Sequence, residues 1–295
     1  KAGAHPALAV GKVRYVGDHV AVVIADTLDQ AKDAAALVEV DYDVHQAVID
    51  LGTAQAWHEE ALAICRELGV PLEIVPIDDA YERELAATEA MLAPGETVTE
   101  LTKQNIQARI RGQRMWNWSN SSGGLFLQTG NMSEKAVGYT TIGGDLEGAL
   151  GVLANVPKTV VMALLDYLYE QTGYEGIALV LAKPPGPELA PNQKGEEELM
   201  PFPVLDACFH LFGAEKLLPE DVEQALAAMF PDYPCEQLRA WVEKFTRLFL
   251  ASIYKWVQAP ISLHIGNLDL DRERALQLPV VQDRAWAAIQ PESLT

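Results

Sequence analysis

The sequence has few basic residues and no long apolar run. Its 22 lysines and arginines stand against 42 aspartates and glutamates, which gives a formal net charge of −20. Nucleic acids and anionic membranes attract basic surfaces, so this balance argues against both as partners. No apolar run is long enough to cross a bilayer, and no charged-then-apolar segment typical of a secretory signal opens the sequence. A membrane protein is therefore not expected.

Cysteine is also scarce. Cys65, Cys208 and Cys235 are far apart and form no C-x-x-C arrangement. This spacing argues against a zinc site or a disulfide framework, because both need clustered or evenly paired cysteines. The sequence therefore predicts buried structural thiols in the reducing cytoplasm.

What remains is the composition of a globular protein of 295 residues, with 49% hydrophobic and 22% charged residues. Residues 11–50 predict a small β-β-α-β unit, with strands over 12–16, 19–25 and 38–42 and a helix that Thr27 caps. This unit is too short to bury a full core of its own. Domain boundaries are therefore expected at 1–50 and 51–295.

The second part alternates helices and strands. Expected helices cover 54–68, 79–91, 100–118, 158–172 (capped by Asn155), 203–212, 219–229 and 235–258, and expected strands cover 71–77 and 125–128. The proline-rich stretch 183–201 predicts a solvated loop and a candidate lid. Such alternation is typical of an α/β fold with an open, Rossmann-like parallel sheet flanked by helices, here with a helical carboxyl-terminal part.

Polar residues gather where the strand at 125–128 gives way to a helix. Thr129, Asn131 and Glu134 occupy this turn. Ligands of open α/β sheets bind at such an edge, the backbone amides favour an anion, and Glu134 could hold Mg²⁺ beside it. The alternative is a capping box in which Glu134 only satisfies a backbone amide. The spacing leaves both interpretations open.

Three cationic residues on predicted helices are also considered as candidate anion-binding groups. Asn105 and Arg109 lie four residues apart on one helix face, so they either grip a carboxylate or phosphate together or form a solvated face. Lys158 begins a helix, where the dipole disfavours a cation, which suggests that it meets an anion. Lys255 lies late in a helix, where a cation complements the dipole, and His264 reads as a packed histidine.

Residues from about 8 to 50 resemble a known segment. The run G-K-V-R-Y-V-G-D-H-V-A-V-V-I-A-D-T-L-D-Q-A-K-D-A-A-A-L-V-E-V-D-Y is similar to the hammerhead segment of molybdenum hydroxylases, the xanthine and carbon monoxide dehydrogenase family. The resemblance implies a scaffold role and supplies no catalytic residue.

Residues from about 57 to 286 resemble NAD⁺ synthases of the adenine-nucleotide-hydrolase superfamily, most specifically over 102–158. The resemblance implies a homodimeric ligase that adenylates deamido-NAD with Mg-ATP, releases pyrophosphate and lets ammonia displace AMP. By position, Thr129 and Lys158 would contact ATP and Glu134 would hold Mg²⁺. The implied deamido-NAD-binding residues are Asn105, Arg109, Asp145 and Lys255. The apolar residues Ile106, Ile110, Met115 and Trp116 on one long helix also favour a dimer.

The sequence departs from this family at its ATP loop. The S-G-G-x-D-S motif is expected before Trp57, and residues 1–56 contain no match to it. Ser122-Gly123-Gly124 imitates it in the reverse context, between a helix and a strand. Three hypotheses therefore stand beside one another: an NAD⁺ synthase-like ligase, a catalytically inactive α/β module or chimeric product, and a fragment of a molybdenum hydroxylase large subunit.

Overall fold

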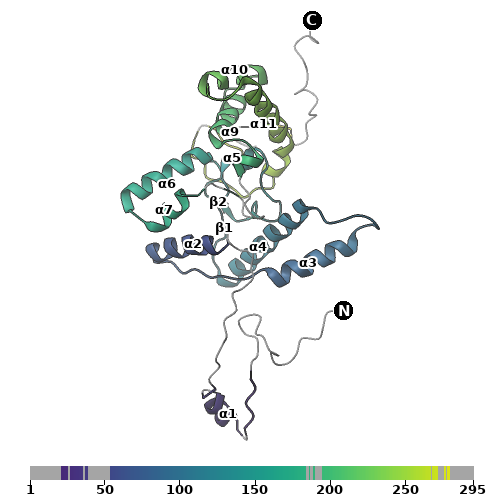
Figure 1. Cartoon of the computed structure of the whole chain (residues 1–295), viewed down its shortest axis with the longest axis vertical. Coiled ribbons are helices and arrows are strands. Elements are labelled where there is room, and N and C mark those ends of the chain that lie inside the picture. The colour runs from purple at the N-terminus through teal and green to yellow at the C-terminus, as the bar shows by residue number, and fades with distance from the viewer. Residues whose placement is uncertain are drawn as a thin grey trace. The chain divides into compact units, whose positions relative to one another are not determined.

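The structure is a computed structural model that divides the chain into two compact units, residues 1–50 and 51–295 (Figure 1). It describes residues 21–25, 27–35, 37–38, 54–183, 186, 189, 195–266, 268–271, 276 and 278–279. No helix in this described part is long and apolar enough to cross a membrane.

The first unit contributes one described helix, α1 (Leu28–Ala35). Thr27 caps it as predicted, since the Gln30 amide donates to Thr27 Oγ1 at 3.3 Å and the Thr27 amide donates to Gln30 Oε1 at 3.2 Å. The expected strand over 19–25 is wrong where it is described, because residues 21–25 form no ladder. The expected strand over 12–16 and all but Val38 of the one over 38–42 lie outside the described residues.

Helices dominate the second unit. They are α2 (Ala54–Leu68), α3 (Asp78–Met91), α4 (Glu100–Ser122), α5 (Met132–Ala136), α6 (Lys158–Thr172), α7 (Glu175–Leu181), α8 (Gly195–Glu198), α9 (Phe202–Phe209), the π-helical turn η1 (His210–Ala214), α10 (Pro219–Met229) and α11 (Cys235–Trp256). All seven predicted helices of this unit are confirmed, and α4 runs one turn further than expected. Helices α7 and α8 were not predicted, and α8 lies within the stretch 183–201 that was expected to be a loop.

The sheet is smaller than the sequence suggests. Within the described residues it has two parallel strands, β1 (Leu127–Gln128) and β2 (Leu150–Gly151), with Leu127 opposite Leu150. Residues 71–77 form no strand, and the Val75 carbonyl instead accepts a hydrogen bond from Arg114 Nη1 on α4 at 3.3 Å. An extensive open sheet is therefore wrong for the described chain, because beyond these two strands the ladder gains only an isolated parallel bridge between Gly151 and Ser262.

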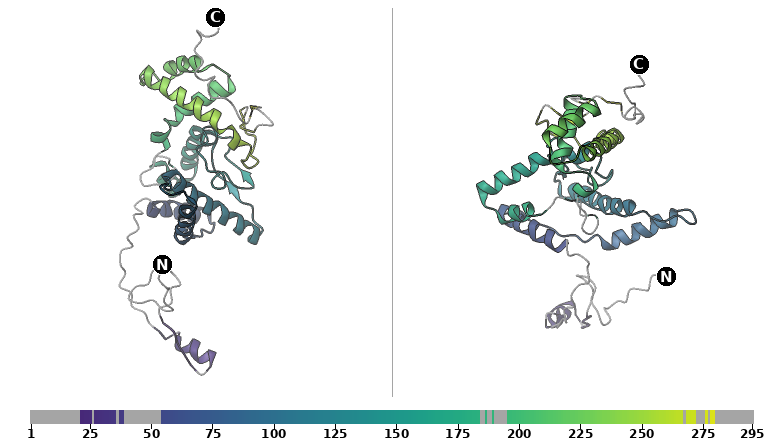
Figure 2. Two further views of the ribbon diagram at one scale, coloured as in Figure 1. Left: turned by 90° about the vertical axis from the view of Figure 1, so that its right-hand side faces the viewer. Right: turned by 45° about the horizontal axis from the view of Figure 1, so that its top comes forward.

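The main core lies in the carboxyl-terminal helices. Helix α11 packs on α10, α9 and α5 (Figure 2). Its buried side chains recur at helical spacing: Leu238, Val242, Phe245, Phe249, Ile253 and Trp256. The rings of Phe249 and Trp256 meet edge to face with centroids 4.9 Å apart. The predicted helical carboxyl-terminal part is confirmed, and α5 packs against its core.

Helix α7 begins because of a residue far away in the sequence. The Glu67 carboxylate on α2 accepts hydrogen bonds from the amides of Glu175, at 2.6 Å, and Gly176, at 3.2 Å. Gly176 lies so close to Ile64 that a side chain there would overlap it. Helices α2, α7 and α6 therefore form one packed group, visible beside the sheet in Figure 1.

Candidate functional site

The site is built on the turn between β1 and α5. The Glu134 amide donates to Asn131 Oδ1 at 3.1 Å, and the Asn131 amide donates to Glu134 Oε2 at 3.3 Å. These two bonds are a complete capping box, so this interpretation of the sequence is confirmed. The box fixes the Glu134 side chain at the start of α5.

The second oxygen of the same carboxylate faces a lysine. Lys158 Nζ, at the first residue of α6, lies 3.5 Å from Glu134 Oε1. The two side chains are 17% and 25% exposed, so the pair is largely shielded from water. The Lys158 ammonium also lies 5.6 Å from the centroid of the Phe202 ring on α9. A carboxylate and a cation thus stand together at the carboxyl edge of the sheet.

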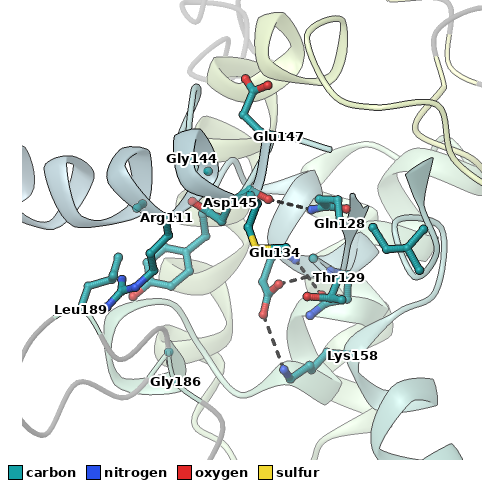
Figure 3. A pocket seen from close by; sticks show the side chains of 18 of the residues that line it. Arg111, Gln128, Thr129, Glu134, Gly144, Asp145, Glu147, Lys158, Gly186 and Leu189 are labelled. Atoms are coloured by element: carbon teal, nitrogen blue, oxygen red, sulfur yellow. Dashed lines mark hydrogen bonds and ion pairs between the residues drawn. The ribbon is translucent and has the colours of Figure 1, made fainter. Parts of the chain in front are cut away.

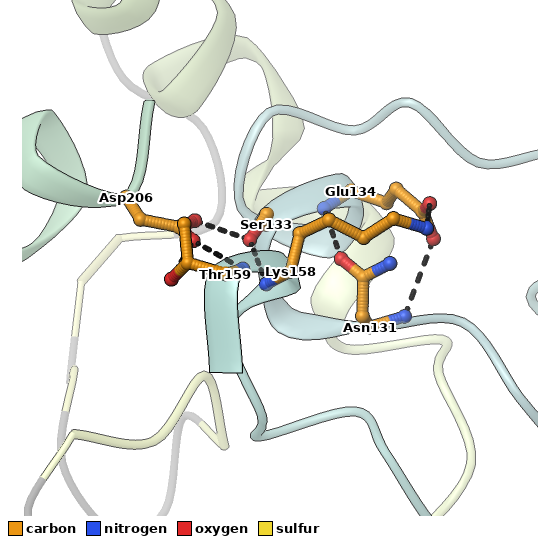
Figure 4. Close-up of polar contacts among 6 residues, drawn as sticks. All are labelled: Asn131, Ser133, Glu134, Lys158, Thr159 and Asp206. Atoms are coloured by element: carbon orange, nitrogen blue, oxygen red, sulfur yellow. Dashed lines mark hydrogen bonds and ion pairs between the residues drawn. The ribbon is translucent and has the colours of Figure 1, made fainter. Parts of the chain in front are cut away.

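A second carboxylate connects α5 to α6 (Figure 4). Asp206 on α9 accepts hydrogen bonds from Ser133 Oγ, from the Thr159 amide at 3.0 Å and from Thr159 Oγ1 at 2.7 Å. Ser133 Oγ accepts in turn from the Lys158 amide at 2.7 Å. Burial raises the pKa of the Asp206 carboxyl. Of the contacts that oppose this rise, the hydrogen bond from Ser133 has the largest effect.

This arrangement corrects the predicted cap of α6. Asn155 does not cap the helix, because its side chain bonds to Ser262 Oγ at 3.1 Å and to the Leu263 carbonyl at 2.8 Å. Ser133 and Asp206 satisfy the first amides of α6 instead. Asn155 therefore fixes the segment that follows α11.

A cavity of about 570 Å³ lies in front of the turn (Figure 3). Four of the seven predicted site residues line it: Thr129, Glu134, Asp145 and Lys158. Arg111, Tyr139, Glu147, Gly186 and Leu189 line it as well. The structure thus brings together the predicted ATP and Mg²⁺ residues.

Asp145 lies at the edge of the cavity and keeps part of its surface exposed. Desolvation by the surrounding protein raises the pKa of its carboxyl. The Thr141 amide, which donates to Asp145 Oδ1 at 2.8 Å, opposes that rise. Thr141 Oγ1 donates to Asn105 Oδ1 at 2.8 Å. Asn105 therefore reaches the cavity edge only through Thr141.

Arg109 and Lys255 lie outside the cavity lining. Arg109 is exposed, and its Nε donates to the Ile142 carbonyl at 3.1 Å. Lys255 lies in the last turn of α11, where a cation complements the helix dipole as predicted, and its Nζ also donates to the carbonyls of Gly138 and Thr140, at 2.6 Å each. Burial lowers the pKa of Lys255, and the Asp145 charge partly restores it.

The histidine prediction also changes. His264 is not packed in apolar surroundings: its Nδ1 lies 2.6 Å from Oδ2 of the fully buried Asp269, and its side chain is half exposed. Across the described residues, no group of three or more histidine, cysteine or acidic side chains could hold a metal by itself.

Asp206 was not among the predicted site residues. Its partners Thr159 and Ser133 precede it by 47 and 73 residues. No local pattern connects residues that far apart. The only signal was its place one helical turn after Phe202, and that spacing is common.

A parallel sheet edge with a capped turn, a carboxylate–lysine pair and a cavity is typical of nucleotide-binding proteins of the α/β class. The fold agrees. The structure is similar to the crystal structure of a glutamine-dependent NAD(+) synthetase from Cytophaga hutchinsonii, with a TM-score of 0.68 over 80% of this chain and 38% of that chain. At 24% identity this likeness concerns the fold, and the α/β class is confirmed.

Sequence comparison identifies the family. Residues 35–245 match the NAD synthase family, and the chain belongs to it. Glutamine-dependent NAD(+) synthetases are similar: that of Thermotoga maritima is 38% identical over 165 residues, 56% of this chain and 28% of the relative. That of Acinetobacter baylyi is 34% identical over 233 residues, 78% of this chain and 40% of the relative. The chain thus spans well under half the length of these relatives.

The amino-terminal resemblance is confirmed too. Residues 1–46 match the a/b hammerhead domain of aldehyde oxidase and xanthine dehydrogenase. The two matched ranges overlap over residues 35–46.

Proposed function

We propose that the cavity binds the triphosphate of Mg-ATP between Glu134 and Lys158, and that the chain handles ATP and deamido-NAD as an NAD⁺ synthase-like ligase. The observation that carries this proposal is the shielded Glu134–Lys158 pair, 3.5 Å apart, in the cavity wall. A phosphate chain that carries a metal ion offers each side chain a better partner: the cation for Glu134 and the anion for Lys158.

The residues fit a magnesium ion that arrives with its nucleotide. Mg²⁺ commonly takes one or two carboxylates and fills its remaining positions with water and substrate phosphates. Glu134 is such a carboxylate, and its Oε1 is not used by the capping box. When bound, the ion would neutralise negative charge on the phosphates.

The chain's own residues then have distinct parts in adenylation. The deamido-NAD carboxylate forms a bond to the α-phosphorus of ATP, and pyrophosphate leaves with the electron pair of the broken bond. Lys158 would stabilise the charge that builds on this leaving group. Thr129 would contact ATP from the turn. Ammonia then displaces AMP from the acyl adenylate.

Deamido-NAD is proposed to bind on the other side of the cavity. Asp145 lies there, and Thr141 connects it to Asn105 on α4. Arg109 and Lys255 are the proposed cations for the dinucleotide, although both now donate to backbone carbonyls. These donors would exchange a carbonyl for a phosphate or carboxylate when the dinucleotide arrives. This function implies a cytoplasmic location and a homodimer.

A second candidate is a catalytically inactive α/β module. Residues 1–56 carry no match to the S-G-G-x-D-S loop, and this observation favours it. Without the amides and aspartate of such a loop, phosphate binding would rely on the residues that line the cavity, Glu134, Lys158 and Thr129 among them. A fragment of a molybdenum hydroxylase is a third candidate, and the match over residues 1–46 is what favours it.

Calorimetric titration with Mg-ATP distinguishes these candidates. The ligase proposal expects binding that raises the melting temperature and that Lys158→Ala weakens at least tenfold, because the loss of a charged hydrogen bond costs about 1.5–3 kcal/mol. Lys103→Ala is the matched control, since Lys103 pairs with Glu100 at 2.7 Å on an exposed helix face outside the cavity lining.

Two results would contradict the proposal. The first is a wild-type chain that does not bind Mg-ATP, which favours the inactive module. The second is an equal loss in both lysine variants. Titration with deamido-NAD then tests Arg109→Ala, which is expected to bind more weakly than the wild type. NAD⁺ formation from ammonium and ATP finally separates a binding module from a ligase.

A further inference from the structure

Both oxygens of the Asp206 carboxylate are engaged by residues that flank the proposed ATP site. Oδ1 accepts from Ser133 Oγ, and Oδ2 accepts from the amide and the hydroxyl of Thr159. Ser133 immediately precedes Glu134, and Thr159 immediately follows Lys158 (Figure 4). One carboxylate therefore holds the backbone on either side of the carboxylate–lysine pair.

The same helix holds the other end of the lysine. Phe202 and Asp206 lie four residues apart on α9 and so share one face. The Phe202 ring meets the Lys158 ammonium, while Asp206 bonds beside the Lys158 backbone. Helix α9, which contacts α5 and α6, therefore lies against Lys158 at two places: at its ammonium group and next to its backbone.

These hydrogen bonds determine which groups at the start of α6 can bind an anion. The amides of Lys158 and Thr159 at the start of α6 are already bonded to Ser133 and Asp206. These two amides are therefore not available to a phosphate, which leaves the Lys158 side chain as the group that these two residues can offer to it. The Asp206 charge at this end also offsets the unfavourable dipole field on Lys158, which explains a lysine at a helix start.

We propose that Asp206 is a positioning residue of the ATP site, which sets the spacing of Glu134 and Lys158 by joining α5 to α6. Ser133 is fully buried, so water has no direct access to replace the bond if the carboxylate is lost. The inference rests on the proposed function, because it assigns Asp206 a role in the binding of Mg-ATP. Asp206 itself does not line this cavity.

The test compares four chains by calorimetric titration with Mg-ATP: the wild type, Asp206→Asn, Lys158→Ala and their double variant. Asp206→Asn keeps the shape but cannot accept all three hydrogen bonds. It is expected to weaken Mg-ATP binding roughly 10–100-fold, the usual effect of losing a residue that orients a ligand. Because Asp206 acts through Lys158, it should weaken binding much less in the Lys158→Ala background.

Glu67→Gln is the control for a purely structural role. Glu67 also caps a helix from a distant part of the chain, with its carboxylate on two amides of α7, and it lies outside the cavity lining. It is expected to lower the melting temperature while the dissociation constant for Mg-ATP stays unchanged. If Asp206→Asn does not fold, Ser133→Ala cuts the same connection at its other end and should weaken binding in the same way.

The outcomes separate the two proposals. If the wild type does not bind Mg-ATP, both are overturned. If it binds and Lys158→Ala weakens it, while Asp206→Asn changes only the melting temperature as Glu67→Gln does, the ATP site stands and the positioning role is overturned. Equal fold-losses from Asp206→Asn with and without Lys158 would also overturn it, because the two residues would then act independently.

Discussion

Glu134→Gln should strengthen the binding of ATP without magnesium and weaken its binding with magnesium. Without a metal ion, a phosphate that binds Lys158 must first displace the Glu134 carboxylate, 3.5 Å from the ammonium. Glutamine removes this competing charge but keeps an oxygen for the capping box with Asn131. With magnesium present, the same substitution removes the proposed metal ligand. One change therefore moves the two affinities in opposite directions.

The size of the effect follows from the separation. Two unit charges 3.5 Å apart attract by about 5 kcal/mol at an effective dielectric constant of about 20, and by about 1 kcal/mol in bulk water. Desolvation offsets much of the larger figure, and exposed pairs contribute up to about 1 kcal/mol. The two side chains are 17% and 25% exposed, so a net value of about 1–2 kcal/mol is reasonable. Metal-free ATP should then bind about 5–30 times more tightly to Glu134→Gln.

Calorimetric titration of ATP with EDTA, and again with excess magnesium, measures both affinities. Glu147→Gln is the matched control: Glu147 lines the same cavity and accepts from Trp116 Nε1 at 3.2 Å, so its loss changes the cavity charge equally. An equal gain for Glu147→Gln would show that general repulsion, and not the pair with Lys158, limits binding. Weaker binding by Glu134→Gln in EDTA would refute the reasoning.

Four further outcomes are expected. Gly144→Ala should lower the free energy of unfolding by about 1–3 kcal/mol in urea, because its Cβ would lie 2.8 Å from the Cβ of Ala108. Gly124→Ala should cost less, because its Cβ would approach nothing closer than the Ser122 hydroxyl oxygen at 3.1 Å; equal costs would contradict this. Burial raises the pKa of Cys208 to about 12, so its thiol should react with a maleimide at neutral pH only after unfolding, whereas the exposed Cys235 should react in the native chain. Labelling at Cys208 itself in the native chain, located by peptide mapping, would disprove the prediction. Burial lowers the pKa of Lys135 below its ordinary value of about 10.4, so the protonated side chain opposes folding until it loses its proton. The melting temperature of the wild type relative to Lys135→Met should therefore rise as the pH increases towards about 10.4. Melting temperatures of the two chains that change in parallel with pH would contradict this prediction. Light scattering should give twice the 32.2 kDa monomer mass at micromolar concentration, and a monomer mass would end the dimer proposal.

Local sequence signals were sufficient for most helices. Helix α10 begins at Pro219, whose missing amide costs nothing at a first helical position, and acidic residues follow in its first turn. Helix α6 ends before Gly173, which adopts the left-handed conformation (φ 66°) that glycine tolerates. In both cases the start or stop signal lies within the element or one residue beyond it.

Long-range contacts account for what the sequence did not reveal. Helix α7 depends on Glu67, more than 100 residues earlier, for its first amides. Residues 71–77 have a strand-like composition, but a strand also needs a neighbour for its amides and carbonyls, and this segment lies against Arg114 instead. The same limitation applies to Asp206, whose three hydrogen bonds connect α9 to two other helices.

The sequence offered two interpretations of Glu134, a helix cap or a metal ligand, and the structure makes them compatible. Oε2 accepts from the Asn131 amide, while Oε1 faces Lys158. A carboxylate has enough acceptor sites for both tasks, and the cap restricts the rotation of the side chain. Oε1 is therefore held towards Lys158 and the cavity before any ligand arrives, which reduces the conformational entropy that binding would otherwise cost. The capping role of Glu134 at the start of α5 therefore supports its proposed role in the site, because the cap holds the side chain in the orientation that faces Lys158.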